Sequence, residues 1–194
     1  GGMPPEIGGI NGLESLDLSA NELTGDGPAE LGDLAMLETL ALEGNRLTGS
    51  IPADLGRLAR LSELRLGGNL LAGPIPSTLA LPPDLVHLSL GENRLTGPVP
   101  PQLGLLGRLR QLDLHDNRLE GDIPEELGRL GALEALSVAG NRLSGLMPAS
   151  LARAHGLRRL DVSRNRLGGE VPAALAGLTA VVQLDVGYNL LTAS

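Results

Sequence analysis

Residues 37–60 read LETLALEGNRLTGSIPADLGRLAR, and this stretch decides the fold because its pattern recurs along the whole chain. Aligned on Leu-x-x-Leu-x-Leu-x-x-Asn, successive units begin 24 residues apart, without a single insertion or deletion. A fixed period of this length indicates a repeat architecture, in which each unit buries its apolar face against its neighbours. The units begin at Leu13, Leu37, Leu61, Leu85, Leu109, Leu133, Leu157 and Val181.

The repeat also sets the domain organisation that we expect. Seven complete units occupy residues 13–180, and partial units occupy residues 1–12 and 181–194, so the sequence predicts one domain over residues 1–194. Open ends of a stacked array expose apolar surface. We therefore expect the chain to be a fragment of a longer protein, with flanking repeats or domains.

Each segment of the unit has its own structural signal. Alternation around Leu40 and Leu42 predicts a short strand with Leu facing inward, and stacked strands would form a parallel sheet on the concave face. An inward Asn45 requires hydrogen bonds to the backbone. Gly49 marks a bend or a positive φ, and Pro52 fixes φ where the chain returns through a short helical turn. The sequence thus predicts a curved, right-handed α/β solenoid.

Composition excludes several functional classes. The net charge is -8 and the pI about 4.8, which disfavours nucleic acid or an anionic membrane surface as the partner. There is no Cys, so thiolate metal sites and disulfides are excluded. No apolar run reaches the roughly 18 residues of a membrane span, so direct membrane insertion is not expected. All 15 basic residues are Arg, a bias that a GC-rich gene or deliberate engineering would produce.

The motif L-x-x-L-x-L-x-x-N-x-L-x-G-x-I-P-x-x-L-G-x-L, which covers essentially the whole chain, resembles the plant-specific class of leucine-rich repeats. Receptor-like kinase ectodomains and polygalacturonase-inhibiting proteins contain such repeats. The resemblance implies a concave face that recognises proteins, peptides or small hormones, and a second short sheet near G-x-I-P. It also implies an extracellular or cell-surface location, whereas the lack of Cys and of N-glycosylation sequons argues against one. The compartment stays open.

Charge on the predicted concave face is uneven. The charged residues that the first two units present there are all acidic, whereas the seventh unit gathers Arg158, Arg159 and Arg164 around Asp161. Such a gradient would orient an extended partner of opposite polarity, although the same charges would also serve a merely solvated face. The candidate binding residues are Asp17, Glu38, Glu63, Arg65, His87, Gln111, Asp113, Arg158, Arg159, Asp161, Arg164 and Tyr188.

Two further columns of residues run beside this face. Arginines directly after the Asn would clamp an anionic strip, or would pack over neighbours and meet Glu or Asp across units. A Thr rank in the second-sheet region suggests ice binding as a minor alternative, interrupted at Ala72, Glu120 and Gly168. The Arg column is Arg46, Arg94, Arg118, Arg142 and Arg166, and the Thr rank is Thr24, Thr48, Thr96 and Thr192 with Ser144.

Catalysis has little support in the sequence. His87 and His115 lie on adjacent units but about 13 Å apart along the strand direction, too far for shared metal ligation. His155 falls on the return segment, away from both. Paired carboxylates such as Asp113 with Asp116 have no pocket-forming insertion to desolvate them. We expect no enzyme activity, no cofactor and no metal.

The sequence therefore predicts recognition of a protein or peptide through the concave face. A structural spacer or scaffold arm in a larger assembly is the alternative. The scarcity of aromatic residues favours the spacer, because binding hot spots are enriched in Trp, Tyr and Arg. The clustered Arg residues and the charge polarity favour recognition. An engineered repeat protein is a third possibility, although units such as SLARAHG are not idealised.

Overall fold

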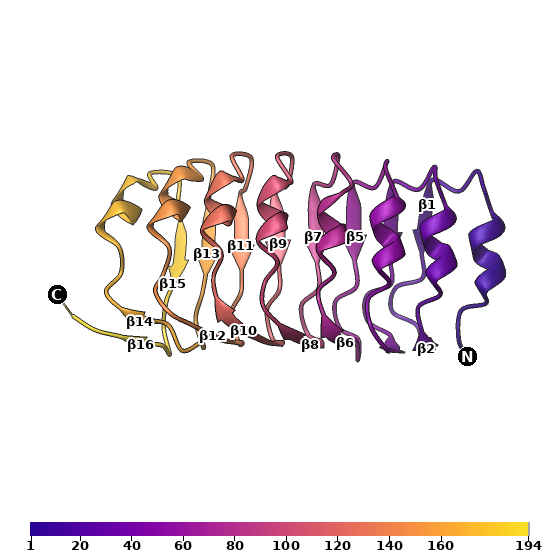
Figure 1. Cartoon of the computed structure of the whole chain (residues 1–194), viewed down its shortest axis with the longest axis horizontal. Helices are drawn as coiled ribbons and strands as arrows, with labels where there is room; N and C mark the ends of the chain where they lie inside the picture. Colours follow the sequence, from indigo (N-terminus) through magenta and orange to yellow (C-terminus); the bar gives the residue numbers. More distant parts are fainter. Residues whose placement is uncertain (194) are drawn as a thin grey trace.

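The computed structural model describes residues 1–193 as a curved solenoid in which each unit adds one strand to a main sheet (Figure 1). All neighbouring strands in this sheet are parallel, and Leu40 pairs with Leu64, one 24-residue unit later. This confirms the predicted sheet and its register. The strands are β1 (Ser15–Asp17), β3 (Thr39–Ala41), β5 (Glu63–Arg65), β7 (His87–Ser89), β9 (Gln111–Asp113), β11 (Ala135–Ser137), β13 (Arg159–Asp161) and β15 (Gln183–Asp185).

A second set of short strands follows the Asn of each unit and confirms the second sheet that the resemblance implied. It is interrupted into three segments, β2–β4, β6–β8–β10–β12 and β14–β16, with a single bridge between Leu146 and Gly168 joining the last two. The strands are β2 (Thr24–Asp26), β4 (Arg46–Thr48), β6 (Ala72–Pro74), β8 (Arg94–Gly97), β10 (Arg118–Asp122), β12 (Arg142–Ser144), β14 (Gly168–Gly169) and β16 (Leu190–Leu191).

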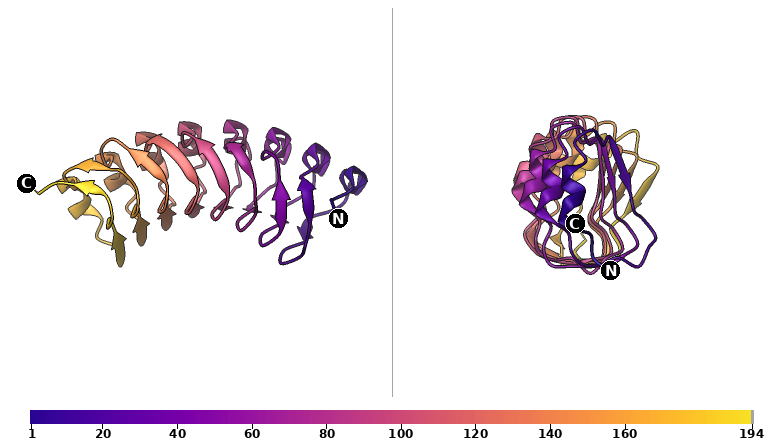
Figure 2. Two further views of the ribbon diagram at one scale, coloured as in Figure 1. Left: turned by 90° about the horizontal axis from the view of Figure 1, so that it is seen from below. Right: turned by 90° about the vertical axis from the view of Figure 1, so that its right-hand side faces the viewer.

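The return segments are 3₁₀ helices on the convex side of the arc (Figure 2, left). Each follows a proline in extended conformation, such as Pro52, whose carbonyl accepts a hydrogen bond from the Leu55 N–H. Helices this short are commonly 3₁₀ rather than α. They are η1 (Pro5–Gly9), η2 (Ala29–Asp33), η3 (Ala53–Arg57), η4 (Ser77–Ala80), η5 (Pro101–Leu105), η6 (Glu125–Arg129), η7 (Ala149–Arg153) and η8 (Ala173–Gly177).

Stacked leucines fill the space between the sheets and the helices. Strand residues such as Leu64, Leu88 and Leu112 are fully buried. Pro82 and Ala154, which replace the last Leu of the unit, are buried as well, so the core accommodates both departures from the pattern. The helices stack closely: a Cβ added to Gly128 would overlap the carbonyl of Ser150 in the next unit. Glycine there permits the contact.

The predicted asparagine ladder is confirmed. Nδ2 of Asn69 donates to the Leu66 carbonyl in its own unit and to the Leu42 carbonyl in the preceding unit, at 3.1 and 2.9 Å. Its Oδ1 accepts from the Leu47 N–H of the preceding unit at 3.0 Å. Each asparagine therefore ties its unit to the one before it. The same arrangement holds at Asn45, Asn93, Asn117, Asn141, Asn165 and Asn189.

The backbone has two left-handed positions in each unit. The predicted one, exemplified by Gly49 at φ 72°, is held by glycine. The other lies directly before the Asn and was not predicted. Glycine occupies it in three units, but the remaining five carry side chains, each at a cost of about 1 kcal/mol. These five are Ala20, Glu92, Asp116, Arg164 and Tyr188, with φ from 49° to 55°.

Candidate functional site

Three adjoining pockets form one trough along the concave face. Their volumes are about 330, 260 and 240 Å³. Gln111 lines both the first and the second pocket, and Ser137 and Asp161 line both the second and the third. The trough therefore crosses the main sheet from β5 to β15, perpendicular to the strands.

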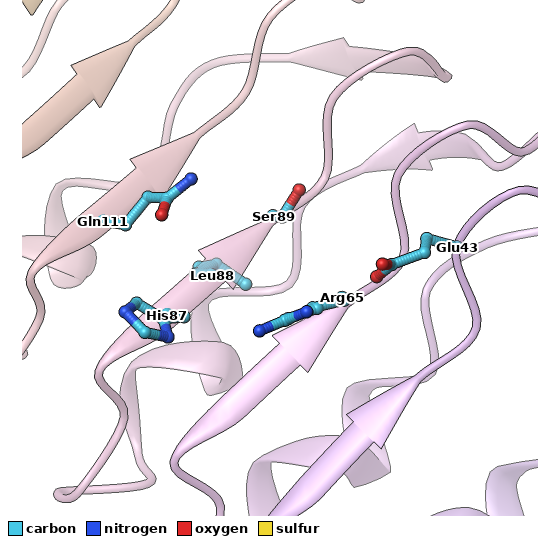
Figure 3. Close-up of a pocket in the computed structure, with 6 residues that line it drawn as sticks. All are labelled: Glu43, Arg65, His87, Leu88, Ser89 and Gln111. Carbon is cyan, nitrogen blue, oxygen red and sulfur yellow. The ribbon is translucent and has the colours of Figure 1, made fainter. Parts of the chain in front are cut away.

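The first pocket is built around alternating charges from neighbouring strands. Arg65 donates to Glu63 on the same strand at 2.7 Å, and Nδ1 of His87 lies 3.5 Å from the other oxygen of Glu63. Figure 3 shows the guanidinium of Arg65 reaching toward His87 while Glu43 points toward Arg65 from the neighbouring unit. The floor is thus polar and its charges are largely balanced.

The second pocket contains an arginine that forms no ion pair with the described residues. Arg159 on β13 stands in register with Ala135 and Gln183, which do not offer it a charge. Arg159 is exposed and forms no ion pair within residues 1–193. Gln111, Asp113 and Asp161 line the same pocket. A carboxylate from a partner would find a guanidinium here that is not engaged in an ion pair within residues 1–193.

The third pocket combines a second unpaired arginine with the only aromatic residue of the chain. Arg164 and Tyr188 both occupy the left-handed position before the Asn, on neighbouring units. Arg164 forms no ion pair among the described residues, and Tyr188 is 84% exposed. A rigid, exposed ring beside an arginine is the type of pair that is enriched at binding hot spots. His115, Asp116, Asp161 and Asp185 complete the polar lining.

Strand aspartates in this face also shape the turn that follows them. Oδ1 of Asp17 accepts from the Ser19 hydroxyl at 2.5 Å and from its backbone N–H at 2.9 Å. These two hydrogen bonds lower the pKa of Asp17. Asp161 accepts from Ser163 in the same way. In each carboxylate, Oδ1 therefore accepts the hydrogen bonds that hold the turn, and these hydrogen bonds do not involve Oδ2.

His115 is the most strongly connected titratable group of the trough. Its Nδ1 lies 2.6 Å from Oδ1 of Asp113, and its Nε2 lies 3.4 Å from Glu92. Burial of the ring acts to lower its pKa, but the hydrogen bond with Asp113, the charges of Asp113 and Asp116, and the contact with Glu92 outweigh burial, so the pKa of His115 is raised.

The structure brings most, but not all, of the sequence-predicted residues into the trough. Four of the predicted residues line none of its three pockets: Asp17, Glu38, Glu63 and Arg158. The other eight predicted residues do line the trough: Arg65, His87, Gln111, Asp113, Arg159, Asp161, Arg164 and Tyr188. Sequence reasoning did not select several polar residues that also line the trough. Among these, Ser89, Asp116, Ser137 and Asp185 occupy the same repeat positions as residues that it selected, whereas Glu43 and His115 occupy the seventh position of the unit, from which it selected none.

The two side columns differ from what the sequence suggested. Within residues 1–193, Arg46 is the one member of the Arg column that meets an acidic residue across units, Glu22 at 3.4 Å. The Thr rank is not uniform, because the Thr48 hydroxyl donates to Asp26 at 2.9 Å. Thr96 is paired in register with Arg118 rather than with another hydroxyl residue.

Among residues 1–193, no three His, Asp or Glu side chains gather in a way that would hold a metal ion. No helix in the same range has the length and apolar character needed to cross a membrane.

Comparison with known families places the repeats in a defined class. Models described as leucine-rich repeat match residues 11–71 and 131–191, and a further such model matches residues 84–106 and 108–130. A search of curated protein sequences gave no match.

Solved structures with the same architecture include plant receptor ectodomains. One is the leucine-rich-repeat ectodomain of GASSHO1/SCHENGEN3 from Arabidopsis thaliana, in complex with CASPARIAN STRIP INTEGRITY FACTOR 2, with 43% identity and a TM-score of 0.98 over 99% of this chain. Another is the Arabidopsis receptor kinase HAESA, in complex with the peptide hormone IDA and the co-receptor SERK1, with 34% identity and a TM-score of 0.94 over 97% of this chain. This chain spans 23% and 32% of their lengths.

A plant ice-binding protein is also similar, with 35% identity and a TM-score of 0.84. That match covers 91% of this chain and 57% of the ice-binding protein. The shared architecture therefore occurs in proteins with different functions, and the surface residues of this chain must carry any functional argument.

Proposed function

The chain belongs to the leucine-rich-repeat family, and from that premise we propose that its concave face binds an extended peptide segment of a partner protein. The continuity of the trough carries the proposal. It crosses the five strand-to-strand steps from β5 to β15, about 24 Å, which is the length of about seven extended residues. Two similar receptor ectodomains are described in complex with a named factor or peptide hormone, which supports a peptide as the ligand.

The distribution of charge supports one orientation of the peptide. Arg159 and Arg164 have no acidic partner within residues 1–193, whereas Arg65 already pairs with Glu63. A carboxylate of the ligand, from an acidic side chain or from its C-terminus, is therefore expected over β13 and β15. Tyr188 would contribute apolar contact area at the same end.

This proposal assigns no chemical step to the chain. The trough is open to solvent along its length, so its carboxylates and His115 serve to bind and orient a ligand. No catalytic residue, cofactor or metal is part of the proposed function. The spacer alternative assigns no ligand to the same surface.

Selection from a displayed library of random linear peptides tests the proposal. The concave variant is Arg159→Glu with Arg164→Glu. The matched control is Arg94→Glu with Arg118→Glu, which reverses two exposed arginines that lack an ion pair in the described structure and lie outside the trough. Peptides selected on the parent are expected to bind the concave variant at least ten-fold more weakly, about 1.4 kcal/mol, and to bind the control as tightly as the parent.

Equal binding to all three proteins, or the selection of no peptide, contradicts the proposal and favours the spacer. Thermal unfolding of both variants checks that the fold is retained. Both substitutions fall on exposed side chains, so neither variant is expected to lose core packing.

A further inference from the structure

A second groove lies on the flank of the solenoid, between the second sheet and the 3₁₀ helices. It has a volume of about 910 Å³ and spans three units, from the end of β10 through the segment after β12 to the segment after β14. It lies across the interruption of the second sheet between β12 and β14. Ile123 and Met147 contribute buried side chains beneath it.

The groove contains an exposed leucine where the other units carry polar residues or proline. Leu146 is 67% exposed, and its side chain lies over Gly169, where an added Cβ would be 2.6 Å from Cδ2 of Leu146. At the position of Leu146, the other units hold Asp26, Ser50, Pro74, Pro98, Asp122 and Glu170.

Four carboxylates line the groove with this leucine, and none has a cationic partner in the part of the chain that the structure describes. Asp122, Glu125, Glu126 and Glu170 line the groove, and no Arg lines it. Within residues 1–193, none of the four forms an ion pair. An exposed apolar side chain framed by uncompensated negative charge is complementary to a cationic segment that carries an apolar residue.

The repeat provides an internal comparison. The equivalent groove four units earlier has a volume of about 370 Å³, and all of its lining residues except Asp54 correspond, unit for unit, to residues that line the Leu146 groove. There, Ala29 stands in place of Glu125, and Ser50 stands in place of Leu146. The backbone thus forms a smaller groove without either residue, so Glu125 and Leu146 are additions to the surface rather than requirements of the fold.

We propose that the flank groove at Leu146 binds a basic peptide segment of a partner protein, with an apolar side chain of the segment packed on Leu146 and Lys or Arg residues paired with the carboxylates around it. This surface is separate from the concave trough, since the two share no lining residue. Association through it is steered by charge and weakens as salt screens the carboxylates.

The test converts this groove to the composition of its counterpart. The groove variant, Glu125→Ala with Leu146→Ser, installs the residues found four units earlier. The matched control, Glu30→Ala with Leu105→Ser, also removes one exposed carboxylate and one exposed leucine, but outside the groove. Random linear peptides displayed on a surface are selected on the parent, and every binder is measured on both variants and on Arg159→Glu with Arg164→Glu.

The expected result is a class of peptides with Lys or Arg flanking an aliphatic or aromatic residue. These peptides bind the groove variant at least ten-fold more weakly and bind the control and the concave variant as tightly as the parent. The proposal is overturned if no selected peptide distinguishes the groove variant, or if the peptides that do so lack basic residues. Peptides sensitive to the concave variant instead report on the trough, so the two proposals can fail separately.

Discussion

Nδ1 of His115 lies 2.6 Å from Oδ1 of Asp113, two residues earlier on the same strand end. The same Asp113 oxygen also accepts the backbone N–H of His115. The pair therefore fixes the ring over Gly91 of the preceding unit, where an added Cβ would overlap it. The side chain closes a turn and remains part of the trough.

This pair makes stability depend on pH. The pKa of His115 is raised because Asp113, Asp116 and Glu92 outweigh the opposing effect of burial. A raised folded-state pKa contributes stability that is complete below the unfolded value of about 6.5 and is lost as pH rises through the folded value. In urea unfolding across this range, His115→Gln should remove that part of the pH dependence, whereas His155→Gln, at an exposed site, should retain it. Identical profiles for the two variants would contradict this assignment.

The asparagine ladder predicts a large effect at a single central residue. Asn93 accepts the Leu71 N–H and donates to the carbonyls of Leu66 and Leu90. Asn93→Ala leaves the buried Leu71 N–H unpaired, while the Leu66 and Leu90 carbonyls keep their hydrogen bonds from Asn69 and Asn117, so the free energy of unfolding should fall by about 2 kcal/mol. Asn21→Ala is the control, because Asn21 is exposed and donates within its own unit, and a cost of about 1 kcal/mol or less is expected. Equal losses in urea titrations would show that the ladder between units contributes nothing.

The left-handed position before the Asn predicts opposite changes in stability when Arg164, which occupies it, and Arg158, which does not, are each replaced by glycine. Arg164 has φ 54°, so Arg164→Gly relieves strain and should raise the free energy of unfolding by roughly 0.5–1 kcal/mol. Arg158 is equally exposed, without a positive φ, and Arg158→Gly should lower it by a similar amount. Chemical denaturation measures both. A loss of stability in Arg164→Gly would mean that the side chain itself stabilises the turn.

Close stacking of the helices can be tested at two glycines. A Cβ on Gly128 would overlap the Ser150 carbonyl, whereas nothing lies within 4 Å of one on Gly131. Gly128→Ala should therefore cost about 1–3 kcal/mol, and Gly131→Ala should be neutral or stabilising by up to about 1 kcal/mol. Thermal unfolding of the two variants distinguishes them. If both are neutral, the helices move apart more easily than their stacking suggests.

The sequence predicts the parts of the fold that depend on the repeat period. Leu40, Asn45, Gly49 and Pro52 recur at fixed positions, and each has one physical reason to be there, so the main sheet, the ladder and the bend follow from them. The 3₁₀ character of the helices does not follow as clearly, because a short Leu-rich segment after a proline also suits one α-turn.

The residues that vary between units were harder to interpret. The left-handed position before the Asn carries Ala20, Glu92 and Tyr188 among others, and none of these residue types signals a positive φ. Gly44, Gly68 and Gly140 at the same position were the available signal. The flank groove was not predicted because its lining side chains come from three units. The available signal was Leu146, an apolar residue at a repeat position that holds polar residues or proline in the other complete units.

The uniform register of the main sheet bears on how such a chain can change length over generations. Each unit meets its neighbour through the same strand pairing and the same asparagine bonds. An in-frame duplication or loss of one whole unit joins surfaces that already fit, so it alters reach and curvature while every remaining junction survives. Gain or loss of a single residue would shift the asparagine of that unit out of the ladder. The chain thus tolerates the duplication or loss of whole units better than the insertion or deletion of single residues. A surface such as the Leu146 groove can therefore arise in one unit while the other units maintain the fold.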